Sequence, residues 1–378
     1  MSRQLHILIT GGGTGGHVFP AIAIADAIKK LRPDTAFLFV GAQGKIEMER
    51  VPKAGYPIEG LNIAGFQRGF SLQSLLRNLS FPFKLIGSAW KAERIVRRFR
   101  PDAVVGTGGY ASGPVMRTAQ QLGIPTIIQE QNSYAGVTNR LLAKKAARIC
   151  VAYDGMEQYF PADRLAFTGN PVRQDILDLT KKREEGLAFY GLDSGKKTIA
   201  VIGGSLGART LNRALADNTE LLAGQPDIQV LWQCGRFYEQ AYTGCATAQL
   251  PNVQLRPFID RMDLLYAAAD LIVSRAGALA ISELCLVGKP VVLVPSPNVA
   301  EDHQTKNAMA LTEKNAARLV RDTEAVEILL PEVLSILKNE ALMFSLGENI
   351  HHLGKPKAAE LIANVVLELA AKPKMSNA

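Results

Sequence analysis

Short apolar runs alternate with amphipathic stretches along the chain. The apolar runs have the length of buried strands, and stretches with helical periodicity, such as residues 21–30, lie between them. Strands separated by helices predict an α/β protein with parallel, doubly wound sheets and right-handed crossovers. The predicted strands cover residues 5–10, 36–41, 57–61, 103–106, 126–129 and 150–152 in the first half and 198–202, 230–233, 253–256, 271–274 and 290–294 in the second.

Two glycine-rich loops occupy corresponding places in the two halves. Gly11 to His17 follows the first strand, and we expect the next helix to begin near Pro20. The stretch 203–207 follows the strand 198–202 and precedes the predicted helix 208–216. Glycines let several N–H groups point at one spot, and a helix N-terminus adds a positive partial charge. Each half is therefore predicted to bind a phosphate.

The chain divides into two predicted domains. Its 378 residues are enough for two ordinary cores, and the turn-rich stretch 169–172 suits a crossing between them. The last helical pattern, 358–371, has no strand after it, so this helix is free to pack back on the first domain. We therefore predict one domain from residues 1–169 plus 354–378 and a second from residues 170–353.

The net charge of +8 is unevenly distributed. Residues 1–169 carry 21 basic and 11 acidic side chains, whereas residues 170–378 carry 22 basic and 24 acidic ones. This asymmetry indicates a negatively charged partner that meets the first half only, either nucleic acid or an anionic membrane surface.

One segment combines apolar bulk with positive charge. Phe66 to Arg100 holds eight basic residues, one acid (Glu93) and many Phe, Leu and Trp side chains, with helical patterns at 71–79 and 84–99 broken near Pro82. It is interpreted either as a packed helix pair with solvated cations or as a surface that lies on anionic lipid.

Neither the cysteines nor the apolar runs point to export. The four cysteines show no Cys-x-x-Cys spacing and are predicted to be reduced core thiols. No run approaches the roughly 18 to 20 apolar residues of a spanning helix, and residues 1–10 lead straight into a strand rather than forming a signal peptide. We expect a protein that stays in the cytosol.

The first glycine loop also matches the dinucleotide fingerprint Gly-x-Gly-x-x-Gly, so a nicotinamide or flavin enzyme is one alternative. That fold expects an acid at the end of the second strand, but the nearest acid here is Glu47, several residues later. The Gly-x-x-x-x-Gly-Lys-Ser/Thr phosphate loop is absent from the sequence, which disfavours a P-loop kinase or ATPase.

Candidate chemistry lies near both loops. His17 ends the first loop, where an imidazole can serve as a base near neutral pH, and His303 is a weaker candidate. Glu283 follows Arg275-Ala276-Gly277 on a predicted helix and suits a ribose diol. Because the sequence has no Asp-x-Asp, a departing diphosphate would be met by loop N–H groups, helix dipoles and a cation such as Arg173.

Taken together, these motifs resemble those of the MurG family of UDP-N-acetylglucosamine transferases, which complete the lipid-linked disaccharide-pentapeptide of the bacterial cell wall. The resemblance runs through the stretches 12–20, 108–114, 130–132, 169–173, 203–209, 275–283 and 303–308. It implies a GT-B fold of two Rossmann-like domains facing a cleft, inversion at the anomeric carbon, and no cofactor or tightly bound metal. The acceptor would be the undecaprenyl-diphosphate-linked muramyl-pentapeptide (lipid I) and the product lipid II.

The resemblance also implies a role for individual residues. The first domain would bind the acceptor diphosphate on Thr14, Gly15 and Gly16, with His17, Tyr110, Glu130 and Asn212 near the reacting centre. Glu283 in the second domain would hold the ribose, the Ile259 backbone the uracil and Gln304 the sugar hydroxyls. The remaining donor-site residues would be Asn132, Arg173, Ser205, Ala278, Leu279, Ala280, Ile281 and Ser282.

One departure bears on the general base. Some relatives have His-Glu-Gln-Asn where this chain has Gln129 to Asn132, so the base is expected to be His17 or Glu130. A UDP-N-acetylglucosamine 2-epimerase would share the fold and donor without a lipid-facing segment, and a non-enzymatic binding module would not need His17, Tyr110 and Glu130 at strand ends. The family implies a peripheral protein on the cytoplasmic face of the inner membrane, cell-wall and division proteins as partners, and no nucleic acid.

Overall fold

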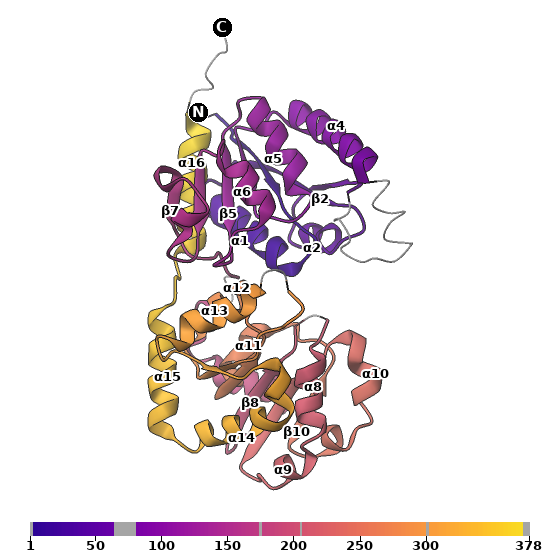
Figure 1. Ribbon diagram of the computed structural model, residues 1–378, viewed down its shortest axis with the longest axis vertical. Helices are drawn as coiled ribbons and strands as arrows, with labels where there is room; N and C mark the ends of the chain where they lie inside the picture. Colours follow the sequence, from indigo (N-terminus) through magenta and orange to yellow (C-terminus); the bar gives the residue numbers. More distant parts are fainter. Residues whose placement is uncertain (1–2, 64–80, 174–175, 205, 300–301, 373–378) are drawn as a thin grey trace. The chain divides into compact units, whose positions relative to one another are not determined.

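The computed structural model describes residues 3–63, 81–173, 176–204, 206–299 and 302–372, with the side chains of 81–86 left out (Figure 1). The described chain forms two compact units. Unit 1 consists of Met1–Val172 and Lys357–Ala378, and unit 2 of Arg173–Pro356. The sequence places the boundaries after residues 169 and 353, whereas the two units meet after residues 172 and 356.

Unit 1 is built on a seven-stranded parallel sheet in which β1 lies between β2 and β4. Successive side chains of its strands alternate between two apolar layers. Ile7 and Ile9 pack beneath α1 and α16, whereas Leu8 packs beneath α4, α5 and α6. The strands, in spatial order, are β3 (Ile58–Leu61), β2 (Ala36–Ala42), β1 (His6–Thr10), β4 (Ala103–Gly106), β5 (Thr126–Glu130), β6 (Arg148–Val151) and β7 (Leu165–Phe167). The helices are α1 (Gly15–Leu31), α2 (Glu47–Lys53), α4 (Phe81–Phe99), α5 (Ser112–Gln121), α6 (Val137–Ala143) and α16 (Ala358–Ala371).

Unit 2 repeats this architecture on a six-stranded parallel sheet centred on β8 and β11. Ile228, Val230 and Trp232, at every second position of β9, face a core beneath α8 and α14. The strands, in spatial order, are β10 (Val253–Arg256), β9 (Ile228–Gln233), β8 (Lys197–Ile202), β11 (Leu271–Ser274), β12 (Val291–Leu293) and β13 (Arg318–Leu319). The helices are α7 (Lys182–Tyr190), α8 (Arg209–Ala216), α9 (Thr219–Ala223), α10 (Glu239–Tyr242), α11 (Met262–Ala268), α12 (Ala278–Val287), α13 (His303–Thr312), α14 (Ala325–Leu337) and α15 (Glu340–His352).

The predicted fold class of two doubly wound parallel-sheet domains is confirmed, with three local corrections. Residues 150–152 are not the last strand of unit 1, because β7 pairs with β6 beyond them. The short strand β13 has no counterpart among the predicted strands. Helix α1 begins at Gly15 rather than near Pro20, because the N–H groups of His17 and Val18 already donate to the Thr14 carbonyl and close its first turn.

Two further expectations concern α16 and the basic segment. Helix α16, yellow in Figure 1, packs on α1 in unit 1, as its pattern predicts, and buries Ile362 and Val366 there. Of the basic segment, the predicted helix 71–79 lies outside the described residues. The predicted helix 84–99 is part of α4, which begins at Phe81 and therefore includes Pro82 in its first turn, where a proline costs no hydrogen bond within the helix.

The four cysteines are free thiols, as expected, but only Cys150, Cys234 and Cys285 are buried, and Cys245 is half-buried. Burial raises the pKa of the Cys150 and Cys285 thiols to about 12, so these two side chains stay protonated and inert near neutral pH.

Candidate active site

Both glycine loops lie where the strand order of their sheet reverses. In unit 1 the chain moves outward in one direction from β1 and in the other from β4, which lies beside β1. In unit 2 the same reversal occurs between the neighbours β8 and β11. Ligands of open α/β sheets bind at the carboxyl ends of the strands that flank such a reversal. The loops after β1 and β4, and those after β8 and β11, are therefore the candidate site elements.

In unit 1 the loops after β1 and β4 are in direct contact. The Gly12 N–H donates to the Gly108 carbonyl at 3.3 Å, and the Thr107 hydroxyl donates to the His17 carbonyl at 2.8 Å. Gly109 has a φ of +85°, and a Cβ there would stand 2.2 Å from the Gly12 carbonyl oxygen. Glycine is required at this position for both reasons.

A buried carboxylate braces the first loop from behind. The Glu47 side chain is completely buried, and its Oε2 accepts the Gly13 N–H at 2.9 Å while its Oε1 accepts the Ala42 N–H at 2.8 Å. The sequence reasoning missed this role. The acid is occupied by the loop's own backbone, so it does not take the place of the ribose-binding acid of a dinucleotide site.

His17 is held in one tautomer by the loop after β4. Its Nδ1 lies 2.9 Å from the Thr107 carbonyl oxygen, which can only accept, so Nδ1 carries the proton and Nε2 carries the lone pair. Burial lowers the pKa of His17 below its ordinary value, while Glu130, the Thr107 carbonyl and Gln131 act in the opposite direction. A neutral imidazole near pH 7 whose lone pair is on Nε2 is suited to accept a proton.

A buried amide network holds the Thr107 carbonyl in place. Gln131 Nε2 donates to that carbonyl at 2.7 Å, and Gln129 Nε2 donates to Asn170 Oδ1 at 2.9 Å. Asn170 Nδ2 in turn donates to the Gln131 carbonyl at 3.0 Å. Gln129, which stands where some relatives have histidine, is therefore a buried structural amide in this chain.

Glu130 ends β5 and is also occupied. Its carboxylate is buried and accepts four hydrogen bonds within the loop 130–139, from the backbone N–H groups of Asn132 and Gly136 and the side-chain amides of Asn132 and Asn139. A carboxylate with four donors has no lone pair left for a substrate proton. The structure thus favours His17 over Glu130 as the base, with Glu130 holding its loop and placing negative charge near His17.

The other predicted residues of unit 1 lie at the surface of the same edge. Thr14 and Gly16 are exposed and Gly15 is half-buried at the N-terminus of α1, whose first turn contains no acid. Tyr110 is 57% exposed in the loop after β4. These positions are accessible to a ligand, and the first-turn N–H groups of α1 suit an anion.

In unit 2 the loop after β8 packs tightly on the loop after β9. Gly207 and Gly235 have φ values of +82° and +88°, and a Cβ on Gly207 would stand 2.1 Å from the Cys234 carbonyl oxygen. The predicted diphosphate ligand Ser205 lies outside the described residues.

Asn212 is not at the surface of the site. Its side chain is completely buried on α8, where Nδ2 donates to the Cys234 carbonyl at 2.9 Å and Oδ1 accepts from Trp232 Nε1 at 2.9 Å. Both ends of the amide are satisfied within the core, so the structure favours a role in holding the loop after β9 over contact with the reacting atoms.

Glu283 and Arg173, which are far apart in sequence, form an ion pair in unit 2. Arg173 Nε donates to Glu283 Oε1 at 2.9 Å, and the Tyr266 hydroxyl donates to Oε2 at 3.0 Å. The carboxylate is buried and oriented by these two donors. Tyr266, on α11, is a residue that the sequence reasoning missed.

The remaining donor-site residues lie around α12 and α13. The backbone of Ala278 to Ser282 forms the first turn and a half of α12, with Gly277 as N-cap and no acid in the first turn. Ile259 is buried in the loop after β10. Gln304 Oε1, expected at the sugar hydroxyls, already accepts the Ser296 N–H at 2.8 Å and so fixes the loop after β12. Across the described ranges, no three His, Cys, Asp or Glu side chains gather in a way that could hold a metal ion.

Comparison with known proteins identifies the family. The glycosyltransferase family 28 N-terminal domain matches residues 7–151, and the C-terminal domain of that family matches residues 198–362. The chain is 55% identical over 368 residues to the UDP-N-acetylglucosamine--N-acetylmuramyl-(pentapeptide) pyrophosphoryl-undecaprenol N-acetylglucosamine transferase of Bacteroides fragilis, covering 97% of this chain and 96% of the relative. It is 52% identical to the enzyme of the same name from Phocaeicola vulgatus over the full length of both.

Solved structures agree with this assignment. The crystal structure of Acinetobacter baumannii MurG superimposes with a TM-score of 0.75 at 30% identity, covering 96% of this chain and 99% of that one. A UDP-GlcNAc 2-epimerase from Neisseria meningitidis reaches a TM-score of 0.67 at 14% identity, which shows a shared fold alone. The near-complete matches at about half identity carry more weight than the shared fold, and the chain belongs to glycosyltransferase family 28 and, within it, to the MurG family of N-acetylglucosamine transferases.

Proposed function

We propose that this protein transfers N-acetylglucosamine from UDP-N-acetylglucosamine to the muramyl 4-hydroxyl of undecaprenyl-diphosphate-linked muramyl-pentapeptide. The observation that carries the proposal is His17, an imidazole whose Nδ1 is fixed on the Thr107 carbonyl so that Nε2 carries the lone pair, in a chain 55% identical to such a transferase. The same fold in a 2-epimerase does not favour that alternative, because its identity to this chain is 14%.

The reaction is an inverting displacement. His17 Nε2 takes the proton of the acceptor hydroxyl as the hydroxyl oxygen forms a bond to the anomeric carbon of the donor sugar. The bond from that carbon to the diphosphate oxygen breaks on the opposite face, and UDP leaves with the bonding electrons. The Thr107 carbonyl and the Glu130 carboxylate stabilise the imidazolium that forms, since both favour the charged ring.

Unit 1 supplies the acceptor site in this proposal. The exposed loop from Thr14 to Gly16 leads into α1, so its N–H groups and the helix dipole attract the acceptor diphosphate. Glu47 holds the Gly13 end of that loop, and His17 is held at the other end by Thr107. The general base and the anion site are thereby fixed by the same backbone.

Unit 2 supplies the donor site. The Glu283 carboxylate, oriented by Arg173 and Tyr266, accepts hydrogen bonds from the ribose hydroxyls. The N-terminus of α12 meets the departing diphosphate with its backbone N–H groups, and Arg173 adds a positive charge beside it. The Ile259 backbone takes the uracil, and Gln304 lies at the sugar end.

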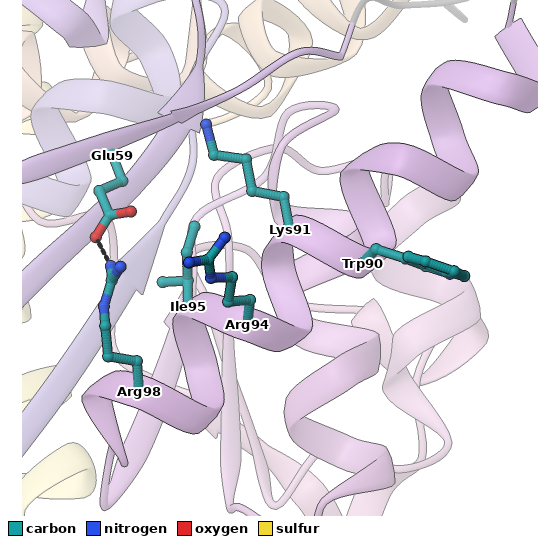
Figure 2. A pocket seen from close by; sticks show the side chains of 6 residues that line it. All are labelled: Glu59, Trp90, Lys91, Arg94, Ile95 and Arg98. Atoms are coloured by element: carbon teal, nitrogen blue, oxygen red, sulfur yellow. Dashed lines mark hydrogen bonds and ion pairs between the residues drawn. The ribbon is translucent and has the colours of Figure 1, made fainter.

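Helix α4 of unit 1 supports a further proposal, that the protein binds peripherally to the cytoplasmic face of an anionic membrane. An open groove of about 600 Å³ runs beside this helix. Its lining, drawn in Figure 2, is Glu59, Trp90, Lys91, Arg94, Ile95 and Arg98. Trp90 is 76% exposed, Lys91 Nζ donates to the Gly60 carbonyl, and Arg98 pairs with Glu59. Each Lys or Arg near anionic lipid contributes on the order of 1 kcal/mol to binding. Within the described residues, no helix has the length and apolar character needed to cross a membrane.

The test is a transferase assay on the purified protein. Labelled UDP-N-acetylglucosamine is incubated with a short-chain lipid-linked muramyl-pentapeptide, and a labelled lipid-linked disaccharide is the expected product. Release of free N-acetylmannosamine instead would replace the transferase with the epimerase. Donor binding without any product would reduce the protein to a nucleotide-sugar-binding module.

A further inference from the structure

Gln233, the last residue of β9, contains a buried acceptor that the fold leaves without a partner. The side chain is 3% exposed, and among the residues that the structure describes nothing donates a hydrogen bond to its Oε1. Leaving a buried acceptor unsatisfied destabilises a protein, so such groups are rare and require an explanation.

Gln233 lies at the carboxyl edge of the sheet in unit 2. It pairs in register with Ile202 of β8 and with Arg256 of β10, each of which is followed by a candidate site loop. The loops after β9 and β10 are in contact, since the Cys234 N–H donates to the Arg256 carbonyl at 3.0 Å and the Arg236 guanidinium lies 4.6 Å from the centre of the Phe258 ring. The unpartnered Oε1 is therefore beside the loop that leads to Ile259.

A second buried glutamine on the same strand shows that the fold can satisfy such an amide. Gln229 is four residues earlier, so it points to the same face at the amino end of the strand. Its Oε1 accepts the Asp193 N–H at 2.9 Å, and its Nε2 donates to the Asp193 carbonyl at 2.8 Å and to the Thr198 hydroxyl at 2.9 Å. Of these two glutamines, only Gln233, at the edge of the sheet where the site lies, has an Oε1 that receives no hydrogen bond from the described residues.

The chemistry of an unpaired acceptor limits its ligand. A carbonyl oxygen needs an N–H or O–H donor, whereas the ionised oxygens of a diphosphate only accept. In a uridine nucleotide the available donors are the imide N–H of the base and the hydroxyls of the ribose. Resting on the donor site proposed above, we infer that Gln233 Oε1 accepts a hydrogen bond from the uridine of the donor nucleotide and is a further substrate-binding residue.

This role predicts opposite effects of one substitution at the two glutamines. Gln233→Met keeps the volume but removes the amide, so the Kd for UDP should rise about three- to tenfold, as expected for one lost hydrogen bond, without a fall in the melting temperature. Gln229→Met is the matched control. It should lower the melting temperature, because it breaks three internal hydrogen bonds, and leave the Kd for UDP unchanged.

Uridine analogues identify the donor group. Titration calorimetry compares UDP with N3-methyl-UDP, 2′-deoxy-UDP and 3′-deoxy-UDP on the unaltered protein and on Gln233→Met. For the analogue that lacks the group bound by Gln233, the difference in Kd between the two proteins should vanish. A difference that persists with all three analogues, or a Gln233→Met protein that binds UDP as tightly as the unaltered one, overturns the inference.

Stability gives an independent outcome. If Gln233→Met loses as much melting temperature as Gln229→Met, the amide is structural and the inference fails. If the unaltered protein does not bind UDP at all, the failure lies with the proposed donor site rather than with Gln233.

Discussion

Replacing Glu47 with glutamine tests whether a buried carboxylate supports the acceptor site from behind. The carboxylate is 0% exposed and accepts the Gly13 and Ala42 N–H groups at 2.9 and 2.8 Å. Glutamine has the same shape but carries one oxygen. Its NH₂ group must therefore face one of the two N–H donors, which leaves that donor buried without an acceptor.

The magnitude follows from these contacts. A hydrogen bond to a charged acceptor contributes about 1.5 to 3 kcal/mol, and the second bond weakens when the charge is lost. Glu47→Gln should therefore lower the free energy of unfolding of unit 1 by about 2 to 4 kcal/mol. No cavity adds to this cost, because the two side chains have similar volume.

Among the kinetic constants for the two substrates, the substitution should change KM for the acceptor only. Glu47 contacts the loop of unit 1 that is proposed to bind the acceptor diphosphate, so KM for the acceptor should rise while KM for the donor is kept. Urea unfolding measures the free energy of unfolding, and hydrogen exchange at the Gly13 and Ala42 amides measures the loss of protection at the two hydrogen bonds. Steady-state kinetics with each substrate varied in turn gives the KM values for acceptor and donor.

Glu49→Gln is the matched control on the same helix. Glu49 is 60% exposed and pairs with Lys53 at 2.7 Å, and an exposed pair of this kind contributes little to stability. If Glu47→Gln unfolds at the same urea concentration as Glu49→Gln and keeps the acceptor KM, the bracing role assigned to Glu47 is refuted.

Three other changes test the remaining parts of the site. His17→Ala should lower kcat by about two to four orders of magnitude without affecting UDP binding, and a loss below about tenfold would place the base elsewhere. In the unaltered protein kcat should fall as pH drops through a value below the ordinary histidine pKa, because burial lowers the pKa of His17 and only the neutral ring accepts a proton; His17→Ala should lack this dependence. Glu283→Ala should raise KM for the donor with kcat largely kept, and an unchanged KM would remove Glu283 from the ribose site. Changing Arg94, Arg97 and Arg98 together to Glu should weaken binding to anionic vesicles while activity on a soluble acceptor analogue survives.

The vesicle experiment requires a control for net charge. The same three reversals at Arg213, Arg318 and Arg321 change the charge of unit 2 equally, and all three side chains are exposed. Equal loss of vesicle binding in both triple variants would show a general charge effect. Unchanged vesicle binding in the α4 variant, or equally strong binding to neutral vesicles, would refute the membrane role and leave α4 as a packed helix with solvated cations.

The sequence predicts the elements of this fold well because periodicity is a local property. The strands flanking each glycine loop and the last helix could be located from runs of apolar residues. The start of α1 could not, because Pro20 suggested a later start, whereas the Thr14 carbonyl already accepts the N–H groups of His17 and Val18. The strand β13 could not be predicted either, because its two residues are too few to show the alternation of apolar and polar positions that marks a strand.

The site was less predictable because side-chain partners are distant in sequence. Asn212 belongs to a matching motif, yet its neighbours Trp232 and Cys234 place it in the core. Glu47 was visible as the acid nearest the end of β2, but its contact with Gly13 crosses 34 positions. An acid a few residues after a strand that ends with Gly41 and Ala42 is the sequence signal that could have found it.

The contribution of α16 to unit 1 affects the order in which the chain can fold during synthesis. Unit 2 is continuous in sequence from residue 173 to 356, so all of its residues emerge from the ribosome before α16 does. Unit 1 begins first but lacks Ile362, Ala363 and Val366 from its core until the last helix has been made. The half of the protein that is translated first is therefore completed last, and until then the apolar face of α1 that α16 covers remains open to other partners in the cell.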